Sequence, residues 1–308
     1  MRTAWLLLIG TVATAGALWL AACGGGGGAP EFQQGDRLRV VASVSAVGAL
    51  ADAVGGDLIE LEVLAGPGVD VHAFELSPAD RRKIDRAHVV AQIGLGLDRF
   101  VEKSASKEQL LVLSDGLPVL REGHEADGAG SGEYDPHVWH DVDNDKRMAM
   151  TLAGVFGRID ETNAAAYMQN ATELAGRLDA ADAEIRALIS EIPDKNRKVV
   201  TNHDALGYLL DRYGLVFVGA VIPALTTSSE PSAKDLVELA DVIKKEGVKA
   251  IFAESSVDPK VAEQLAKDTG VKIVEGLYAD SLGPAGSGAD TIEGMLLANA
   301  EKIVEALR

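Results

Sequence analysis

The chain has 308 residues, of which 47% are hydrophobic and 25% charged, enough apolar material for about two folded domains. Lys and Arg number 29 against 47 Asp and Glu, and the resulting net charge of −18 excludes a nucleic-acid-binding protein. Cys23 is the single cysteine, so an internal disulfide, a redox pair and a thiolate zinc site are excluded as well. Any bound metal must therefore be held by nitrogen and oxygen atoms.

Residues 1–22 are typical of a signal peptide, and residues 23–36 of a flexible Gly-rich tether. Arg2 provides the positive start, and residues 5–20 form an apolar stretch that is short for a membrane span. Small residues precede Cys23, as in bacterial lipoprotein signals, so we expect Cys23 to be lipidated and to become the mature N-terminus. This predicts a protein of the cell envelope, lipid-anchored on the extracytoplasmic side of the membrane. An ordinary secretory peptide is the alternative.

From Arg37 onward, short runs of Val, Ile, Leu and Ala alternate with longer amphipathic segments. We expect strands over 38–43, 59–64, 88–93 and 110–113, and helices over 47–54, from Ser77 onward and over 97–103. Pro78 fits the first helical position after Ser77. Alternating strands and helices indicate a parallel sheet covered by helices.

Residues 121–133 interrupt this alternation and are typical of an exposed loop. Further on, residues 161–192 carry one continuous apolar stripe with steps of three and four residues. The stripe predicts a single helix of roughly 45 Å that ends before Pro193. A two-helix hairpin is the alternative, but no turn-forming cluster interrupts the segment.

The alternation then restarts, with strands over 198–201, 216–221, 250–253 and 272–275, and helices over 205–213, 232–246, 259–269 and 291–306. We therefore predict an α/β protein with two lobes, each a mostly parallel sheet flanked by helices. The N-terminal lobe spans 37–158 and the C-terminal lobe 197–308, and one long rigid helix over 161–192 joins them.

Four potential metal ligands lie at or near the ends of predicted strands: His72, His137, His203 and Asp280. Ligands of parallel α/β sheets bind beyond the carboxyl ends of the strands, so a cleft between the lobes could gather these side chains. Three imidazoles and one carboxylate suit a tetrahedral zinc ion.

The spacing alone does not decide this interpretation, because 65 and 66 residues separate the three histidines and solvated surface histidines are common. Glu254 also follows a strand and rivals Asp280 as the carboxylate ligand. His88 begins a predicted buried strand and fits a structural role. His124, in the 121–133 loop, could capture zinc weakly, although a solvated position is the simpler interpretation.

Three motifs carry a resemblance that decides between these alternatives. They are Gly-Val-Asp-Val-His-Ala-Phe-Glu-Leu-Ser-Pro at 68–78, Asp-Pro-His-Val-Trp at 135–139 and Asn-His-Asp-Ala-Leu-Gly-Tyr at 202–208. Together they resemble the zinc/manganese substrate-binding lipoproteins of bacterial ABC metal importers, from about Arg37 to the C-terminus. The resemblance implies two α/β lobes joined by a rigid helix, with one metal ion in the interlobe cleft. It implies His72, His137, His203 and Asp280 as ligands, with Glu254 as an outer partner.

The resemblance favours zinc over manganese, because manganese-type members commonly carry a glutamate where this chain has His203. Imidazole also favours zinc by its softness. The chain departs from the family at Val71, where proline is usual, at His88, where an acidic residue is usual, and at His140, where an apolar residue is usual. His140 is therefore an accessory candidate beside the site.

The function expected is a monomeric binding protein, not an enzyme, that captures zinc and delivers it to an ABC importer permease. A manganese-binding member is the alternative within the family. From other classes, a zinc-dependent hydrolase would need an open coordination position and a general base, and a surface adhesin is a third option. No G-x-S-x-G motif, P-loop or complete G-x-G-x-x-G motif occurs, since Gly94-Leu95-Gly96 lacks the third glycine.

Overall fold

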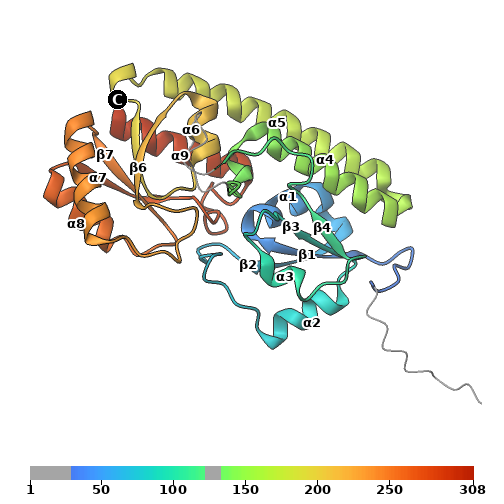
Figure 1. Cartoon of the computed structure of the whole chain (residues 1–308). Helices are drawn as coiled ribbons and strands as arrows, with labels where there is room; N and C mark the ends of the chain where they lie inside the picture. Colours follow the sequence, from blue (N-terminus) through green and yellow to red (C-terminus); the bar gives the residue numbers. More distant parts are fainter. Residues whose placement is uncertain (1–28, 122–132) are drawn as a thin grey trace, which may run out of the picture.

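The computed structural model describes residues 29–121 and 133–308, which form two lobes connected by a long helix (Figure 1). The strands are β1 (Leu38–Val44), β2 (Ile59–Ala65), β3 (Val89–Gln92), β4 (Leu110–Val112), β5 (Lys198–His203), β6 (Val216–Ile222), β7 (Ala250–Glu254) and β8 (Lys272–Leu277). The helices are α1 (Ser45–Gly55), α2 (Pro78–Arg86), α3 (Arg99–Glu102), α4 (Val142–Ile159), α5 (Ala164–Ser190), α6 (Gly207–Tyr213), α7 (Ala233–Glu246), α8 (Lys260–Thr269) and α9 (Ile292–Leu307).

Each lobe contains one parallel sheet, and the two sheets share the same strand order. The order is β2-β1-β3-β4 in the first lobe and β6-β5-β7-β8 in the second. In both sheets the first strand in the chain is therefore central. This confirms the predicted α/β class and the two parallel sheets.

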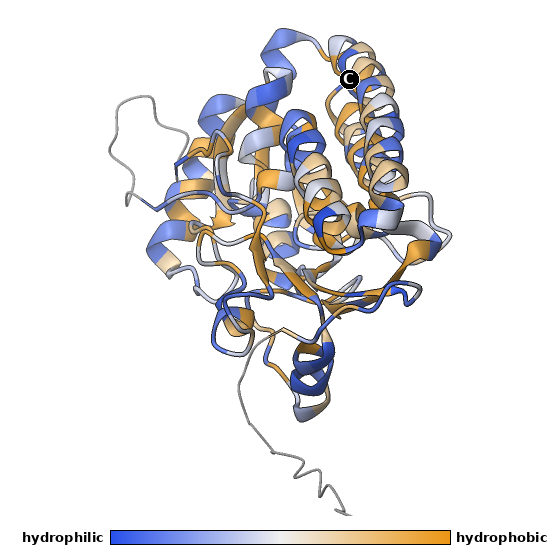
Figure 2. Ribbon diagram, turned by 90° about the vertical axis from the view of Figure 1, so that its right-hand side faces the viewer, coloured by the Kyte–Doolittle hydropathy of each residue, from blue (hydrophilic) through white to orange (hydrophobic). Residues whose placement is uncertain are grey.

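Alternate residues of the central strands enter two different cores. Val199 and Phe252 face the core that α6 and α9 complete, whereas Val200 and Ile251 face the core beneath α7 and α8. This alternation follows from the period of two along a strand and explains why both faces of the sheet are apolar. Figure 2 shows hydrophobic strands enclosed by helices that have both hydrophilic and hydrophobic faces.

The long helix is continuous, so the two-helix hairpin alternative is wrong. α5 runs over 27 residues, about 40 Å, after a short 3₁₀ helix at Glu161–Asn163. Its buried positions are Tyr167, Ala171, Leu174, Leu178, Ala181, Ile185 and Ile189, which form the predicted stripe. α5 packs against α4 on one side and α9 on the other, and a single apolar core continues along it through both lobes. Because that core is shared, the exact lobe boundaries stay predictions.

Local signals explain several element starts. Ser77 caps α2 with Asp80 in a capping box and Pro78 in the first turn, as predicted. Ser232 and Asp235 form a second capping box before α7. Two expected strand ends were each two residues too short, because β5 continues to His203 and β8 to Leu277. Within residues 29–121 and 133–308, no helix is both long and apolar enough to cross a membrane.

Candidate metal centre

The structure brings the four predicted side chains together between the lobes. His72 lies in the loop after β2, His137 directly precedes a 3₁₀ helix at Val138–His140, and Asp280 lies three residues beyond β8. His203 is the last residue of β5 rather than a residue after it, which corrects the expected strand end. One ligand atom from each side chain lies within 4.8 Å of the others.

The converging atoms are the Nε2 atoms of the three histidines and the carboxylate oxygens of Asp280. The distances from Nε2 to the nearest Asp280 oxygen are 3.6 Å for His72, 3.3 Å for His137 and 3.5 Å for His203. All five atoms are buried and have no hydrogen-bond partner within the described residues. Buried polar atoms normally have one, so this cluster has the character of a cation site.

Two carboxylates orient the deeper histidines from behind. Asp135 Oδ1 accepts from the backbone N–H of His137 at 2.9 Å and lies 2.7 Å from its Nδ1. Glu254 Oε1 accepts from the backbone N–H of His203 at 3.0 Å and lies 2.7 Å from its Nδ1. A carboxylate can only accept, so Nδ1 carries a proton in each ring, and once the ring is neutral the lone pair of Nε2 faces the centre.

The strand register explains the position of Glu254. β5 and β7 are neighbours in which Thr201 pairs with Phe252, so His203 and Glu254 lie side by side two residues further on. By position alone Glu254 rivalled Asp280 as the carboxylate ligand, and the family resemblance made Glu254 an outer partner. In the structure Glu254 lies behind the imidazole of His203, outside the group of converging atoms.

His72 is held differently. Its backbone N–H donates to Asp70 Oδ1 at 2.9 Å, and its side chain is 7% exposed, whereas those of His137 and His203 are fully buried. A cavity of about 590 Å³ opens beside it, lined by Leu95, Arg99, Tyr134, Leu225 and Thr226 among others. His72 therefore lies at the mouth of the site.

Charge coupling inside the site is strong. Burial alone would lower the pKa of His137, but the carboxylates of Asp135 and Asp280 outweigh it and raise the pKa to about 9. Burial also opposes the charge on His203, yet Glu254 and Asp280 raise the pKa of its imidazole well above the usual value. The three imidazoles hold the pKa of the Asp280 carboxyl well below its usual range despite burial. In the metal-free protein, protons on these imidazoles therefore supply the positive charge that a bound cation would otherwise supply.

His140 is outside the group of converging atoms. Its Nε2–H donates to the carbonyl oxygen of Ala279 at 3.0 Å, and Trp139 Nε1–H donates to the same oxygen at 3.1 Å. Burial, reinforced by the nearby His137, lowers the pKa of His140 to about 3, so its ring is neutral. Both side chains therefore fix the residue before Asp280.

His88 is buried, and its Nδ1 accepts from the backbone N–H of Arg39 at 2.9 Å, in agreement with the predicted structural role. Cys23 and His124 lie outside the described residues. Sequence reasoning assigned no role of their own to Asp135 and Asp70. The signal that could have found both is the shared Asp-x-His spacing at 70–72 and 135–137.

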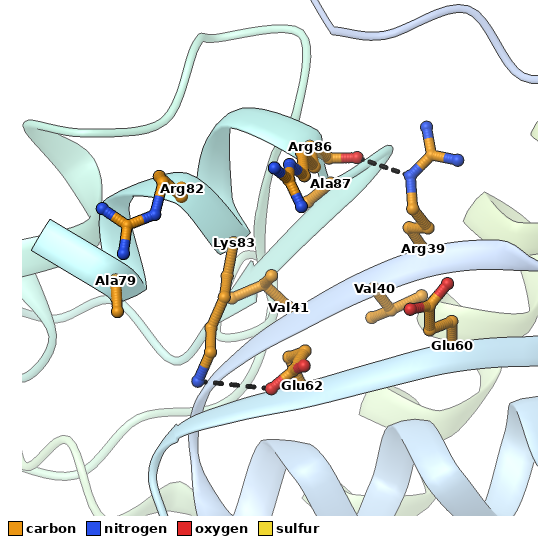
Figure 3. Close-up of a pocket in the computed structure, with 10 residues that line it drawn as sticks. All are labelled: Arg39, Val40, Val41, Glu60, Glu62, Ala79, Arg82, Lys83, Arg86 and Ala87. Atoms are coloured by element: carbon orange, nitrogen blue, oxygen red, sulfur yellow. Dashed lines mark hydrogen bonds and ion pairs between the residues drawn. The ribbon is translucent and has the colours of Figure 1, made fainter.

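A second hollow, of about 200 Å³, lies between α2 and the β1–β2 edge of the first lobe (Figure 3). Lys83 Nζ lies 3.3 Å from Glu62 Oε2, and Arg39 Nε donates to the carbonyl oxygen of Arg86 at 2.7 Å. Arg39 is near the start of β1, whereas the ligands gather at the carboxyl ends of the strands. This hollow is therefore separate from the metal centre.

Comparisons with known proteins find relatives that match most of the chain. A family model described as "Zinc-uptake complex component A periplasmic" (ZnuA) matches residues 40–306. The manganese-binding lipoprotein MntA of Bacillus subtilis is 32% identical, with 88% of this chain and 90% of that protein covered. The manganese ABC transporter substrate-binding lipoprotein PsaA of Streptococcus mitis is 27% identical, with 94% of each covered. The structure of the periplasmic zinc binding protein TroA from Treponema pallidum matches with a TM-score of 0.81 and 28% identity, covering 88% of this chain and 99% of that one.

Proposed function

The chain belongs to the ZnuA family of metal-binding substrate-binding proteins of ABC transporters, and on this premise we propose that its cargo is zinc. The members of this family are binding proteins that work with a membrane permease and are not enzymes. The hydrolase alternative is therefore set aside, and the remaining question is the identity of the metal.

The observation that carries the zinc proposal is the donor set. Three imidazole nitrogens and one carboxylate oxygen converge, and the third nitrogen belongs to His203. Zinc accepts four ligands of this kind, whereas manganese prefers carboxylate, carbonyl and water oxygens. A site with three imidazoles and one carboxylate is poor in the ligands that would favour manganese.

The spacing of the donors supports the same proposal. Zinc–nitrogen and zinc–oxygen bonds of about 2.0–2.1 Å place the corners of a tetrahedron roughly 3.3–3.4 Å apart. The three distances from Nε2 to Asp280 are 3.3, 3.5 and 3.6 Å, close to such edges. The widest pair in the group, at up to 4.8 Å, would contract slightly around the ion.

Manganese is the second candidate, because the relatives MntA and PsaA are named for manganese. Titration of metal-free protein with each metal, alone and in competition, separates the two. We expect the wild type to prefer zinc and His203→Glu to shift the preference toward manganese, since it replaces an imidazole with a hard carboxylate. His203→Gln removes the imidazole without adding charge and serves as the matched control. A wild type that prefers manganese, or a preference that His203→Glu leaves unchanged, contradicts the zinc proposal.

We also propose that Cys23 is the lipidated N-terminus that anchors the protein outside the membrane. The names of the relatives MntA and PsaA include "lipoprotein", and small residues precede Cys23 in this chain. Mass spectrometry of membrane-extracted protein should find a diacylglyceryl modification on a peptide that begins at Cys23. A mature N-terminus at another residue would reject this proposal. The monomeric state stays a prediction.

A further inference from the structure

All three histidines of the metal centre donate their backbone N–H to a carboxylate, but the three carboxylates differ in the further hydrogen bonds that they accept. The bonds run from His72 to Asp70, from His137 to Asp135 and from His203 to Glu254, at 2.9, 2.9 and 3.0 Å. Asp135 and Glu254 also bind the ring of their own histidine. Asp70 instead uses its second oxygen to accept from Thr227 Oγ1, at 2.7 Å, in the opposite lobe.

Further bonds between the lobes surround this pair. Thr227 lies in the segment between β6 and α7, and its neighbour Ser228 donates from Oγ to the carbonyl oxygen of His72 at 3.4 Å. On the other side of the same loop, the N–H of Gly68 donates to Ser281 Oγ at 3.1 Å. The loop that carries His72 is thus bound to the second lobe at three points within five residues.

Elsewhere the loop is held by packing and turns: Val71 is buried in the core, and Phe74 packs against Phe100. The loop contains no helix or strand between the end of β2 at Ala65 and the start of α2 at Pro78. His137 and His203, in contrast, stand next to regular elements and are held at their rings. Apart from its bond to Asp70 in the same loop, the backbone of His72 is hydrogen-bonded, among the described residues, to Ser228 of the opposite lobe.

We propose that Asp70 and Thr227 form a latch between the lobes that positions His72 over the metal and sets the rate at which the metal leaves. The proposal rests on the proposed function, because it takes His72 to be a metal ligand. Asp70 links the position of His72 to the contact between the lobes, since one of its oxygens accepts from the backbone N–H of His72 and the other accepts from Thr227 of the opposite lobe. When the lobes separate, the second bond breaks and His72 loses its anchor. Release would then begin at this histidine.

The decisive variant is Thr227→Val, which keeps the branched shape and the bond from Asp70 to His72 but removes the bond between the lobes. Loss of a hydrogen bond to a charged group that is partly open to water corresponds to about a tenfold change in the release rate. Zinc release into excess chelator, followed by stopped flow, should be about tenfold faster in Thr227→Val. Thr227→Ser keeps the hydroxyl and should restore the wild-type rate. Thr269→Val is the matched control, since the Thr269 hydroxyl donates to the carbonyl oxygen of Leu265 within α8, away from the contact between the lobes.

A double-mutant cycle with His72→Ala separates positioning from simple loop stability. If the latch acts through His72, adding Thr227→Val to His72→Ala changes the release rate no further. An additional tenfold acceleration in that background, or a wild-type rate in Thr227→Val alone, overturns the latch. If wild-type protein binds no zinc at equilibrium, the zinc proposal fails. The release rates of the same variants are then measured with manganese. Faster release in Thr227→Val supports the latch, and either of the two contrary outcomes above overturns it.

Discussion

The deep and the outer histidines of one metal centre are held in contrasting ways. His137 and His203 are fully buried, and each has a carboxylate 2.7 Å from its Nδ1. His72 lies at the mouth of the site on an irregular loop, and only its backbone is bound by a carboxylate. The contrast suggests a division of labour in which two imidazoles are preorganised and the third arrives as the lobes close.

Removing a deep ligand should have the largest effect. We expect His203→Ala to weaken zinc binding more than His72→Ala does, because the three ligands left without His72 are all fully buried, whereas those left without His203 include the loop-held His72. Both substitutions should lower zinc affinity by more than the roughly 10–100-fold expected when an orienting carboxylate is removed. Competition with a chelator of known affinity measures both variants. Equal losses would remove the distinction between deep and outer histidines.

Acid should release the metal next most strongly. The pKa of His137 is raised to about 9 and that of His203 is raised as well, so in the metal-free protein both rings hold protons at pH 7. Metal binding must displace these protons, so affinity falls as pH falls from about 9. If binding displaces one proton, zinc affinity falls about tenfold for each pH unit, and if it displaces two, about a hundredfold. Zinc affinity measured at pH 9, 8, 7 and 6 tests this, and a flat profile would show that the histidines are not the principal ligands.

The orienting carboxylates should have an intermediate effect. Glu254→Gln and Asp135→Asn keep the shape of the side chain but weaken the acceptor at Nδ1, so we expect zinc affinity to fall by roughly 10–100-fold. Glu275→Gln, on the exposed side of β8, is the matched control and should bind zinc like the wild type. Isothermal titration of the three variants makes the comparison. Wild-type affinity in Glu254→Gln would show that His203 needs no support from behind.

Much of the fold follows from the sequence because its signals are local. The alternation of apolar runs and amphipathic helices, the Ser77–Asp80 capping box and the stripe of α5 each depend on residues close together in the chain. Strand ends were less predictable: β5 extends to His203 because the strand continues into the site, where polar residues replace the apolar pattern.

The metal centre was predictable only in part. His72, His137 and His203 are far apart in the chain, and spacing alone did not assign them; the family motifs did. The roles of Glu254 and Asp70 depend on the register of β5 against β7 and on the contact between the lobes, and neither is encoded in local sequence. The family resemblance implied an outer role for Glu254, but its contact with His203 and the role of Asp70 became clear only from the folded chain.

A buried carboxyl without imidazole partners provides the last and smallest test. Asp145 in α4 is fully buried like Asp280, and neither carboxyl has a hydrogen-bond partner within the described residues, but imidazoles lie beside Asp280 alone of the two. Burial, aided by Asp141 and Glu293, raises the pKa of Asp145 well above the usual value. The folded protein therefore holds this proton more tightly than the unfolded chain, and stability falls as pH rises from about 4.

Asp145→Asn should match the wild type near pH 4 and be more stable by about 1–3 kcal/mol at pH 8, because the variant has no carboxyl to ionise. Asp143→Asn, in the same turn, is the control of opposite sign. Hydrogen bonds from Lys146 and Arg212 lower the pKa of Asp143 to about 2, so its carboxylate stabilises the fold above pH 4, although only slightly at an exposed position. Chemical unfolding of metal-free protein at both pH values measures the two variants. A loss of stability at pH 8 in Asp145→Asn would mean that the carboxylate of Asp145 is satisfied, and that imidazole partners are not what distinguishes Asp280.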